Sequence, residues 1–82
     1  MNATEERVTA LIVEMFLAGD ESFPLTADMD LLEEGVCDSL GFIQLAAELE
    51  QVFPGVSIDD ADIGPESMSR ITDIAALVAP TD

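Results

Sequence analysis

Ser39 is the residue whose type and position could support chemistry. It follows Asp38 and opens an apolar-periodic run from Leu40 to Phe53, so it falls at the N-cap or the first residue of a helix. A helix start carries unsatisfied N–H groups and a partial positive charge, which favour a phosphate group. The chain has no histidine, lysine or tyrosine to activate a hydroxyl. An exposed serine here is therefore poorly equipped as a nucleophile, but it can be the residue to which another enzyme attaches a group.

The simplest alternative is that Ser39 only caps the helix, which is a common use of serine before an apolar run. Asp38 could equally be the cap, which would leave Ser39 at the first helical position. Capping and attachment are compatible, so the pattern alone leaves both assignments open.

Charge and composition limit the classes of partner. The chain of 82 residues is 49% apolar, which predicts a single domain over residues 1–82, and 18 acids face two bases, for a net charge of −16. Such a surface repels nucleic acids and anionic membranes but attracts basic patches on proteins. The first six residues are acidic rather than basic, and no apolar run approaches membrane-spanning length. We expect a discrete, monomeric protein of the cytoplasm.

The sequence predicts no specific metal site. One cysteine and no histidine exclude a zinc site. The acid clusters that start at Asp28 and Asp60 do not match the spacing of a calcium-binding EF-hand loop. Cys37 has no basic neighbour to lower its pKa, so we expect it to pack in the interior rather than react.

Apolar periodicity predicts helices over residues 4–18, 39–53 and 69–78, with Asn2 or Thr4 and Ser69 as caps of the first and the last. The segment 56–68 is expected to be a loop with a short, weak helix. The segment 19–37 reads as a long loop that must be anchored by apolar residues. These expected anchors are Phe23, Leu25, Met29, Leu31 and Leu32. The predicted fold class is all-α, with three long helices and one short helix in a small bundle.

Asp38-Ser39-Leu40, near the middle of a small acidic chain with helices on both sides, resembles the acyl carrier protein family. The resemblance covers about Val8 to Val78 and implies a four-helix-type carrier bundle. It implies that Ser39 receives 4′-phosphopantetheine from a transferase that uses coenzyme A and magnesium. The protein would then carry a thioester-linked group from an adenylating or acyltransferring enzyme to a downstream synthase or transferase, without being a catalyst itself.

The spacing before Ser39 indicates the branch of this family. Gly35 stands four residues before Ser39, and the form Glu-Gly-x-x-Asp-Ser resembles the D-alanyl carrier protein and free-standing carriers of natural-product pathways. It implies an aminoacyl or unusual acyl cargo, with antibiotic biosynthesis as the expected setting. The alternatives are a fatty-acid-type carrier and a small acidic interaction module without a prosthetic group.

A second apolar strip on the central helix predicts partner docking. Leu40, Ile43 and Ala47 fall beside the core stripe, at i, i+3 and i+7, with Glu48 and Glu50 further along. In the carrier family this helix is the main recognition element. The expected docking residues, with Asp38 at the helix start, are Asp38, Leu40, Ile43, Ala47, Glu48 and Glu50.

Overall fold

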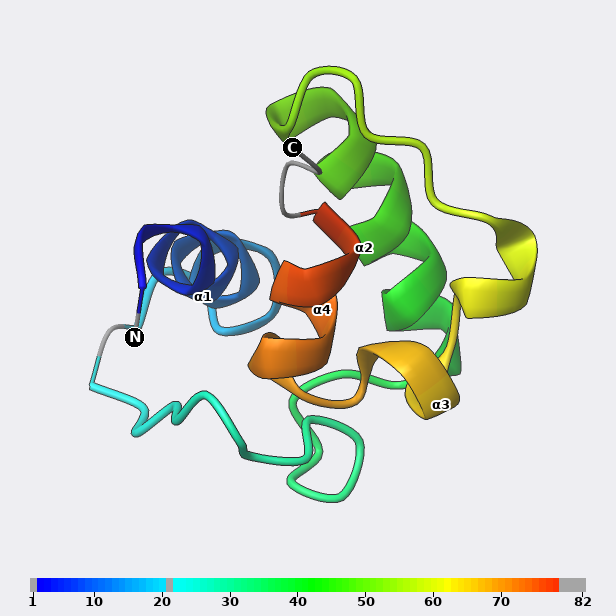
Figure 1. Ribbon diagram of the computed structural model, residues 1–82. Coiled ribbons are helices and arrows are strands. Elements are labelled where there is room, and N and C mark those ends of the chain that lie inside the picture. Colours follow the sequence, from blue (N-terminus) through cyan, green and yellow to red (C-terminus); the bar gives the residue numbers. More distant parts are fainter. Residues whose placement is uncertain (1, 21, 79–82) are drawn as a thin grey trace.

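The computed structural model describes residues 2–20 and 22–78. Three longer helices, α1 (Ala3–Phe16), α2 (Ser39–Val52) and α4 (Ile71–Val78), are accompanied by a 3₁₀ turn η1 (Asp60–Asp62) and a single-turn helix α3 (Pro65–Met68). Helix α4 lies between α1 and α2, while α3 contacts both α2 and α4 (Figure 1). All regular structure in these two ranges is helical, which confirms the predicted all-α fold of three long helices and a short one.

Helix α1 begins with a reciprocal cap. The Asn2 side chain accepts a hydrogen bond from the Glu5 N–H at 2.8 Å, and the Glu5 carboxylate accepts one from the Asn2 N–H at 3.0 Å. Asn2, and not Thr4, is therefore the cap. The helix ends at Phe16, two residues earlier than predicted, because Ala18 adopts a positive φ of 52° and the chain leaves the helical path.

The interior is formed by one stripe from each long helix. The apolar stripe of α2 is buried, and Val8 and Ile12 of α1 are fully buried, with Leu11, Met15 and Phe16 packed against the core. Helix α4 is strongly apolar and contributes four buried residues. The buried hydrophobic residues of α2 and α4, with Phe53, are Phe42, Leu45, Ala46, Leu49, Phe53, Ile71, Ile74, Ala75 and Val78.

The long connection between α1 and α2 is fixed to the junction between α3 and α4. The Leu31 N–H donates to the Ser69 carbonyl at 2.7 Å, and the Thr72 N–H donates to the Ala27 carbonyl at 3.0 Å. The Arg70 guanidinium donates to the carbonyl of Asp28 at 3.1 Å. Leu31 is fully buried beside these bonds, so it anchors the loop as predicted.

Two local predictions about these segments are wrong. Leu32 is 42% exposed, because the turn that buries Leu31 directs the following side chain outward. Ser69 does not cap the last helix, which begins at Ile71. Ser69 instead ends α3 in a helical conformation and uses its carbonyl to accept the Leu31 bond.

Candidate attachment site

A tight acidic turn leads the chain into the start of α2. The Asp30 carboxylate accepts hydrogen bonds from the N–H groups of Leu32 and Glu33, both at 3.0 Å. Gly35 then adopts a positive φ of 74°, which other residues rarely adopt. The N–H groups of Val36 and Cys37 both donate to the Leu31 carbonyl, at 2.9 and 3.1 Å. The turn is thus closed by the chain's own bonds, and it fixes where α2 begins.

Asp38 is the N-cap of α2, which resolves the choice that the sequence left open. Its backbone is extended, and its carboxylate accepts a hydrogen bond from the Gly41 N–H at 2.7 Å. Ser39 is the first residue of the helix and is exposed. In the part of the chain that the structure describes, no hydrogen bond occupies the Ser39 hydroxyl. The capping role therefore belongs to Asp38, and the hydroxyl is available for modification.

The surroundings of Ser39 fit a phosphodiester. The N–H groups of Ser39 and Leu40 precede the first intrahelical hydrogen bond, which runs from the Phe42 N–H to the Asp38 carbonyl. Both residues are exposed, so these donors and the positive end of the helix dipole can reach a phosphate on the Ser39 oxygen. The residues present therefore fit phosphopantetheine as the resemblance implies.

Gly41 allows the close packing beneath this site, a role that the sequence analysis missed. A Cβ at position 41 would lie 2.9 Å from the Cys37 sulfur, 3.1 Å from the Phe16 ring and 3.2 Å from the Asp38 carboxylate. Only glycine lets the cap and these two side chains close on the first turn of α2. A glycine inside an otherwise good helical pattern, which costs about 1 kcal/mol relative to alanine, was the available signal.

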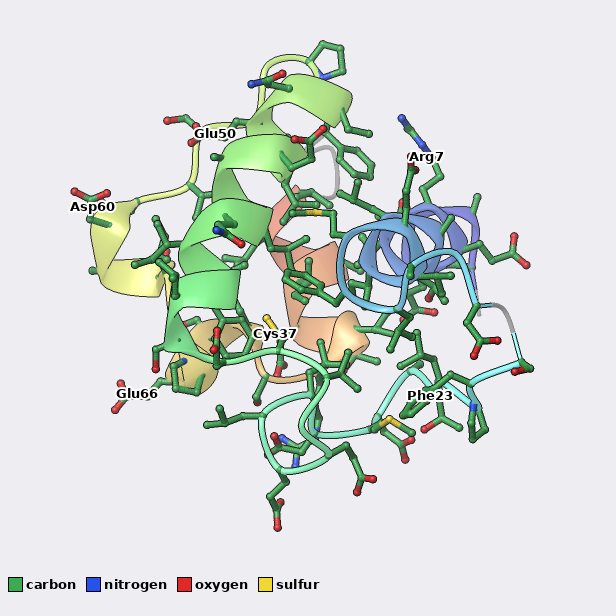
Figure 2. The ribbon with its side chains drawn as sticks, turned by 180° about the vertical axis from the view of Figure 1, so that it is seen from behind. Arg7, Phe23, Cys37, Glu50, Asp60 and Glu66 are labelled. Carbon is green, nitrogen blue, oxygen red and sulfur yellow. The ribbon has the colours of Figure 1, made fainter. Side chains whose placement is uncertain are left out.

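Cys37 is a packing residue, as expected. It is 3% exposed and belongs to the core, at the point where the loop meets α2 (Figure 2). Burial, and secondarily the charge of Asp38, raises the pKa of its thiol to about 11. The thiol is therefore protonated at neutral pH and is a poor nucleophile.

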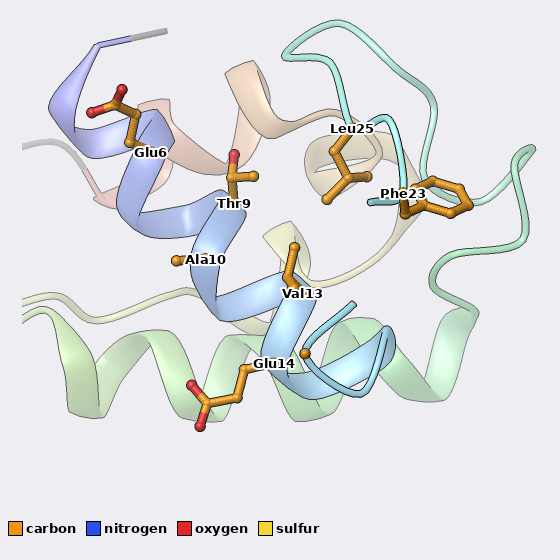
Figure 3. Close-up of a pocket in the computed structure, with 8 residues that line it drawn as sticks. Glu6, Thr9, Ala10, Val13, Glu14, Phe23 and Leu25 are labelled. Carbon is orange, nitrogen blue, oxygen red and sulfur yellow. The ribbon is translucent and has the colours of Figure 1, made fainter. Parts of the chain in front are cut away.

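A hollow of about 320 Å³ is lined by Asp38 and Leu40, the neighbours of Ser39 in the sequence, although Ser39 itself does not line it; we call it the attachment hollow. It is bounded by the end of α1, the acidic turn and the start of α2. Its lining residues are Phe16, Leu32, Gly35, Val36, Cys37, Asp38, Leu40, Gly41 and Gln44. A larger hollow of about 540 Å³ lies between α1 and the segment that follows it, where Val13, Phe23 and Leu25 line it (Figure 3). The two hollows share no lining residue, so the larger one is separate from the Ser39 site.

The residues expected to dock partners lie along α2 in different environments. Leu40 and Ile43 are 62% and 56% exposed, and Ala47 is exposed too. Glu48 is half-buried. Glu50 is exposed, but its carboxylate accepts a hydrogen bond from the Ile58 N–H at 2.7 Å and so holds the segment that follows α2 (Figure 2).

Residues 2–20 and 22–78 contain neither a candidate metal cluster nor a membrane-spanning helix. No group of three or more acids, cysteines or histidines there is arranged to hold a metal ion. None of the helices described is both long enough and apolar enough to cross a membrane.

Comparison with known proteins identifies the family. Residues 6–79 match the model described as the phosphopantetheine attachment site. The chain is 37% identical over 62 residues to the D-alanyl carrier protein of Lactococcus lactis subsp. cremoris (strain MG1363), which covers 76% of this chain and 77% of that protein. It is 41% identical over 49 residues to the D-alanyl carrier protein of Abiotrophia defectiva, over 60% of each chain. No solved structure matches the chain with comparable significance.

The family model spans most of the chain and includes the whole of α2, the acidic turn and the core stripes described above. The chain therefore belongs to the phosphopantetheine attachment family: it is a carrier protein that bears 4′-phosphopantetheine, and it is not itself an enzyme.

Proposed function

We propose that Ser39 is the attachment residue and that the arm carries a small amino acid, with D-alanine as the first candidate. The assignment of Ser39 rests on one observation at the start of α2: Asp38 caps the helix, while the Ser39 hydroxyl is exposed and makes no hydrogen bond. The cargo is supported by the relatives named above, which are D-alanyl carrier proteins, and by the spacing of Gly35 and Ser39.

The chain's own residues would each have a defined task in this function. Asp38 holds the first turn of α2, while the free N–H groups of Ser39 and Leu40 stabilise the phosphodiester. The terminal thiol of the arm supplies the thioester. Phe42 and Leu49 of α2 and Ile74 of α4 are fully buried in the core, which the chain's own side chains fill. This packing favours a small cargo held outside the core over a long acyl chain held within it.

Attachment can be tested by intact mass. The apo-protein is incubated with coenzyme A, magnesium and a phosphopantetheinyl transferase of broad specificity. We expect one added phosphopantetheine in the unmodified chain, none in Ser39→Ala, and full modification in the control Ser57→Ala, which removes another exposed hydroxyl. Modification that persists in Ser39→Ala would refute the assignment.

Cargo can be tested on the holo-protein. A D-alanine-activating ligase with ATP should form a D-alanyl thioester, while malonyl transfer from coenzyme A by a fatty-acid-type transferase should be slow. Efficient malonyl loading without aminoacyl loading would favour the fatty-acid branch instead. The relatives are D-alanyl carrier proteins and give no particular support to the expected setting in antibiotic biosynthesis.

We also propose that α2 is the docking surface for the transferase and the loading enzyme, and that residues 1–82 act as one carrier domain. Leu40, Ile43 and Ala47 offer apolar contact beside Ser39, with Asp38 and Glu48 as acidic neighbours. Glu50 contributes less directly, since its carboxylate is bonded to the Ile58 N–H. The net charge of −16 makes a basic partner surface the electrostatic complement.

A further inference from the structure

We propose that the attachment hollow is the seat of the first segment of the phosphopantetheine arm, namely its branched pantoyl unit with two methyl groups. This inference deepens the proposed function and rests on Ser39 as the attachment residue. It concerns the arm itself, independently of the cargo.

The position of the hollow favours this occupant. Asp38, Leu40 and Gly41 line it, and these residues flank Ser39 on both sides along the chain. Ser39 itself does not line the hollow, so an arm on its oxygen enters the hollow by turning past Asp38 or Leu40. The larger hollow on α1 is lined by no residue near Ser39 in the sequence.

The chemistry of the lining follows the order of groups along the arm. The phosphate comes first, then a carbon with two methyl groups, then a hydroxyl and an amide. Leu32, Val36 and Leu40 offer apolar contact for the two methyl groups. Gln44 also lines the hollow, and its side-chain amide can donate to or accept from the hydroxyl and the amide without adding charge near the phosphate.

The volume limits how much of the arm can be held. About 320 Å³ lies near the lower end of the range of small-molecule sites, roughly 300–1,000 Å³. The hollow thus suits the first segment and leaves the distal thiol outside, where a loading enzyme can reach it.

The exposure of the lining residues is an independent reason for an occupant. Among the residues that the structure describes, the exposed large hydrophobic ones are Leu32, Leu40 and Ile43, and the first two line the hollow. Methyl groups of the arm would remove part of that apolar surface from water, which is favourable. Ile43 is nearly as exposed as Leu40 but does not line the hollow, so it provides a matched control.

The test is nuclear magnetic resonance on the holo-protein, after intact mass has confirmed one arm per chain and Ser39→Ala has remained unmodified. We expect nuclear Overhauser effects between the two methyl groups of the arm and the methyl groups of Leu32 and Leu40. The amide signals of Val36, Gly41 and Gln44 should shift between the apo and holo forms more than those of Val13 and Gly19, which line the other hollow.

The variants separate contact in the hollow from a general effect on the helix. Leu32→Ala and Leu40→Ala should each weaken the remaining Overhauser effects and narrow the methyl signals of the arm, because the arm becomes more mobile. Ile43→Ala should leave both unchanged. A modified protein whose arm shows no contact with Leu32 or Leu40 would overturn this inference and leave Ser39 as the attachment residue. A protein that gains no mass at all would overturn both proposals.

Discussion

Asp38 and Ser39 are neighbours with different roles, so substitutions at the two positions should affect stability differently. Asp38→Ala removes the side chain that accepts the Gly41 N–H, so we expect a loss of about 1 kcal/mol in the free energy of unfolding. Ser39→Ala removes an exposed hydroxyl with no bond to lose, so its effect should stay within about 0.5 kcal/mol. Urea unfolding of the apo-proteins measures both. Equal destabilisation by the two changes would show that Ser39 contributes to the cap.

The sequence alone could not make this assignment, because aspartate and serine are about equally good caps and adjacent positions shift the helix start by only one residue. It also could not show why Gly41 is needed. Phe16 and Cys37 meet Gly41 only after the long loop has folded back, and such contacts leave no local pattern. Ser39 itself could be selected, because its position at a helix start depends only on nearby residues.

The raised pKa of Cys37 predicts a specific alkaline loss of stability. The pKa is about 11 in the folded protein against an ordinary value of 9.0. The folded state therefore binds the proton more tightly than the unfolded state, so stability is fully present below about pH 9 and falls as pH rises towards about 11. Thermal unfolding across this range should show a steeper decline for the unmodified chain than for Cys37→Ala. Parallel curves would mean that the thiol does not titrate differently in the two states.

At the scale of elements, Leu31 anchors the long loop between α1 and α2 more strongly than the neighbouring Leu32 does. Leu31→Ala should lower the free energy of unfolding by about 2–5 kcal/mol, because Leu31 is fully buried and its loss leaves a cavity. Leu32→Ala should change it by no more than about 0.5 kcal/mol, since Leu32 is 42% exposed. Urea unfolding provides the comparison. Similar losses for both variants would contradict the observed register of the turn.

Periodicity predicted the elements well where one helix face is buried along its length, as in α1 and α2. It did not predict which of Leu31 and Leu32 enters the core, because a turn has no repeating period that shows which side chains are buried. The start of α4 was misplaced for a related reason. Ser69 has the chemistry of a cap, but its carbonyl is used by Leu31 across the loop, and backbone bonds of this kind depend on no particular side chain.

Helix α2 should also show a division between apolar and charged contacts with a loading enzyme. Ile43→Ala should lower kcat/KM for loading of the holo-protein about fivefold, equivalent to about 1 kcal/mol, if Ile43 is covered in the complex. Glu48→Lys should mainly slow association, so its effect should shrink at high salt. Loading rates at low and high salt test this, with circular dichroism as the control for folding. Unchanged loading by both variants would place the docking surface elsewhere, with residues 56–68 as the next candidate.

At the scale of the whole molecule, the acidic charge is concentrated and poorly offset. Both arginines serve the chain's own backbone: Arg7 donates to the Val52 carbonyl and lies 4.3 Å above the Phe53 ring, and Arg70 donates to the Asp28 carbonyl. Arg7 thus links α1 to the end of α2, and Arg70 links the loop between α1 and α2 to the start of α4. These contacts stabilise the fold at positions where carbonyls need partners, but they leave 18 acids on a molecule of 82 residues.

This charge predicts that salt stabilises the protein. Like charges on a compact surface repel one another, and 0.1 M salt reduces their range to about 10 Å. Raising sodium chloride from a low concentration to that level should increase stability by on the order of 1 kcal/mol, or about 4–8 °C in Tm for a domain of this size. The combined change Glu33→Gln and Glu34→Gln removes two adjacent exposed acids. It should raise Tm at low salt and make the further increase with salt smaller, whereas sucrose should stabilise both proteins equally. If Tm does not change with sodium chloride in either protein, repulsion among the acids does not limit stability.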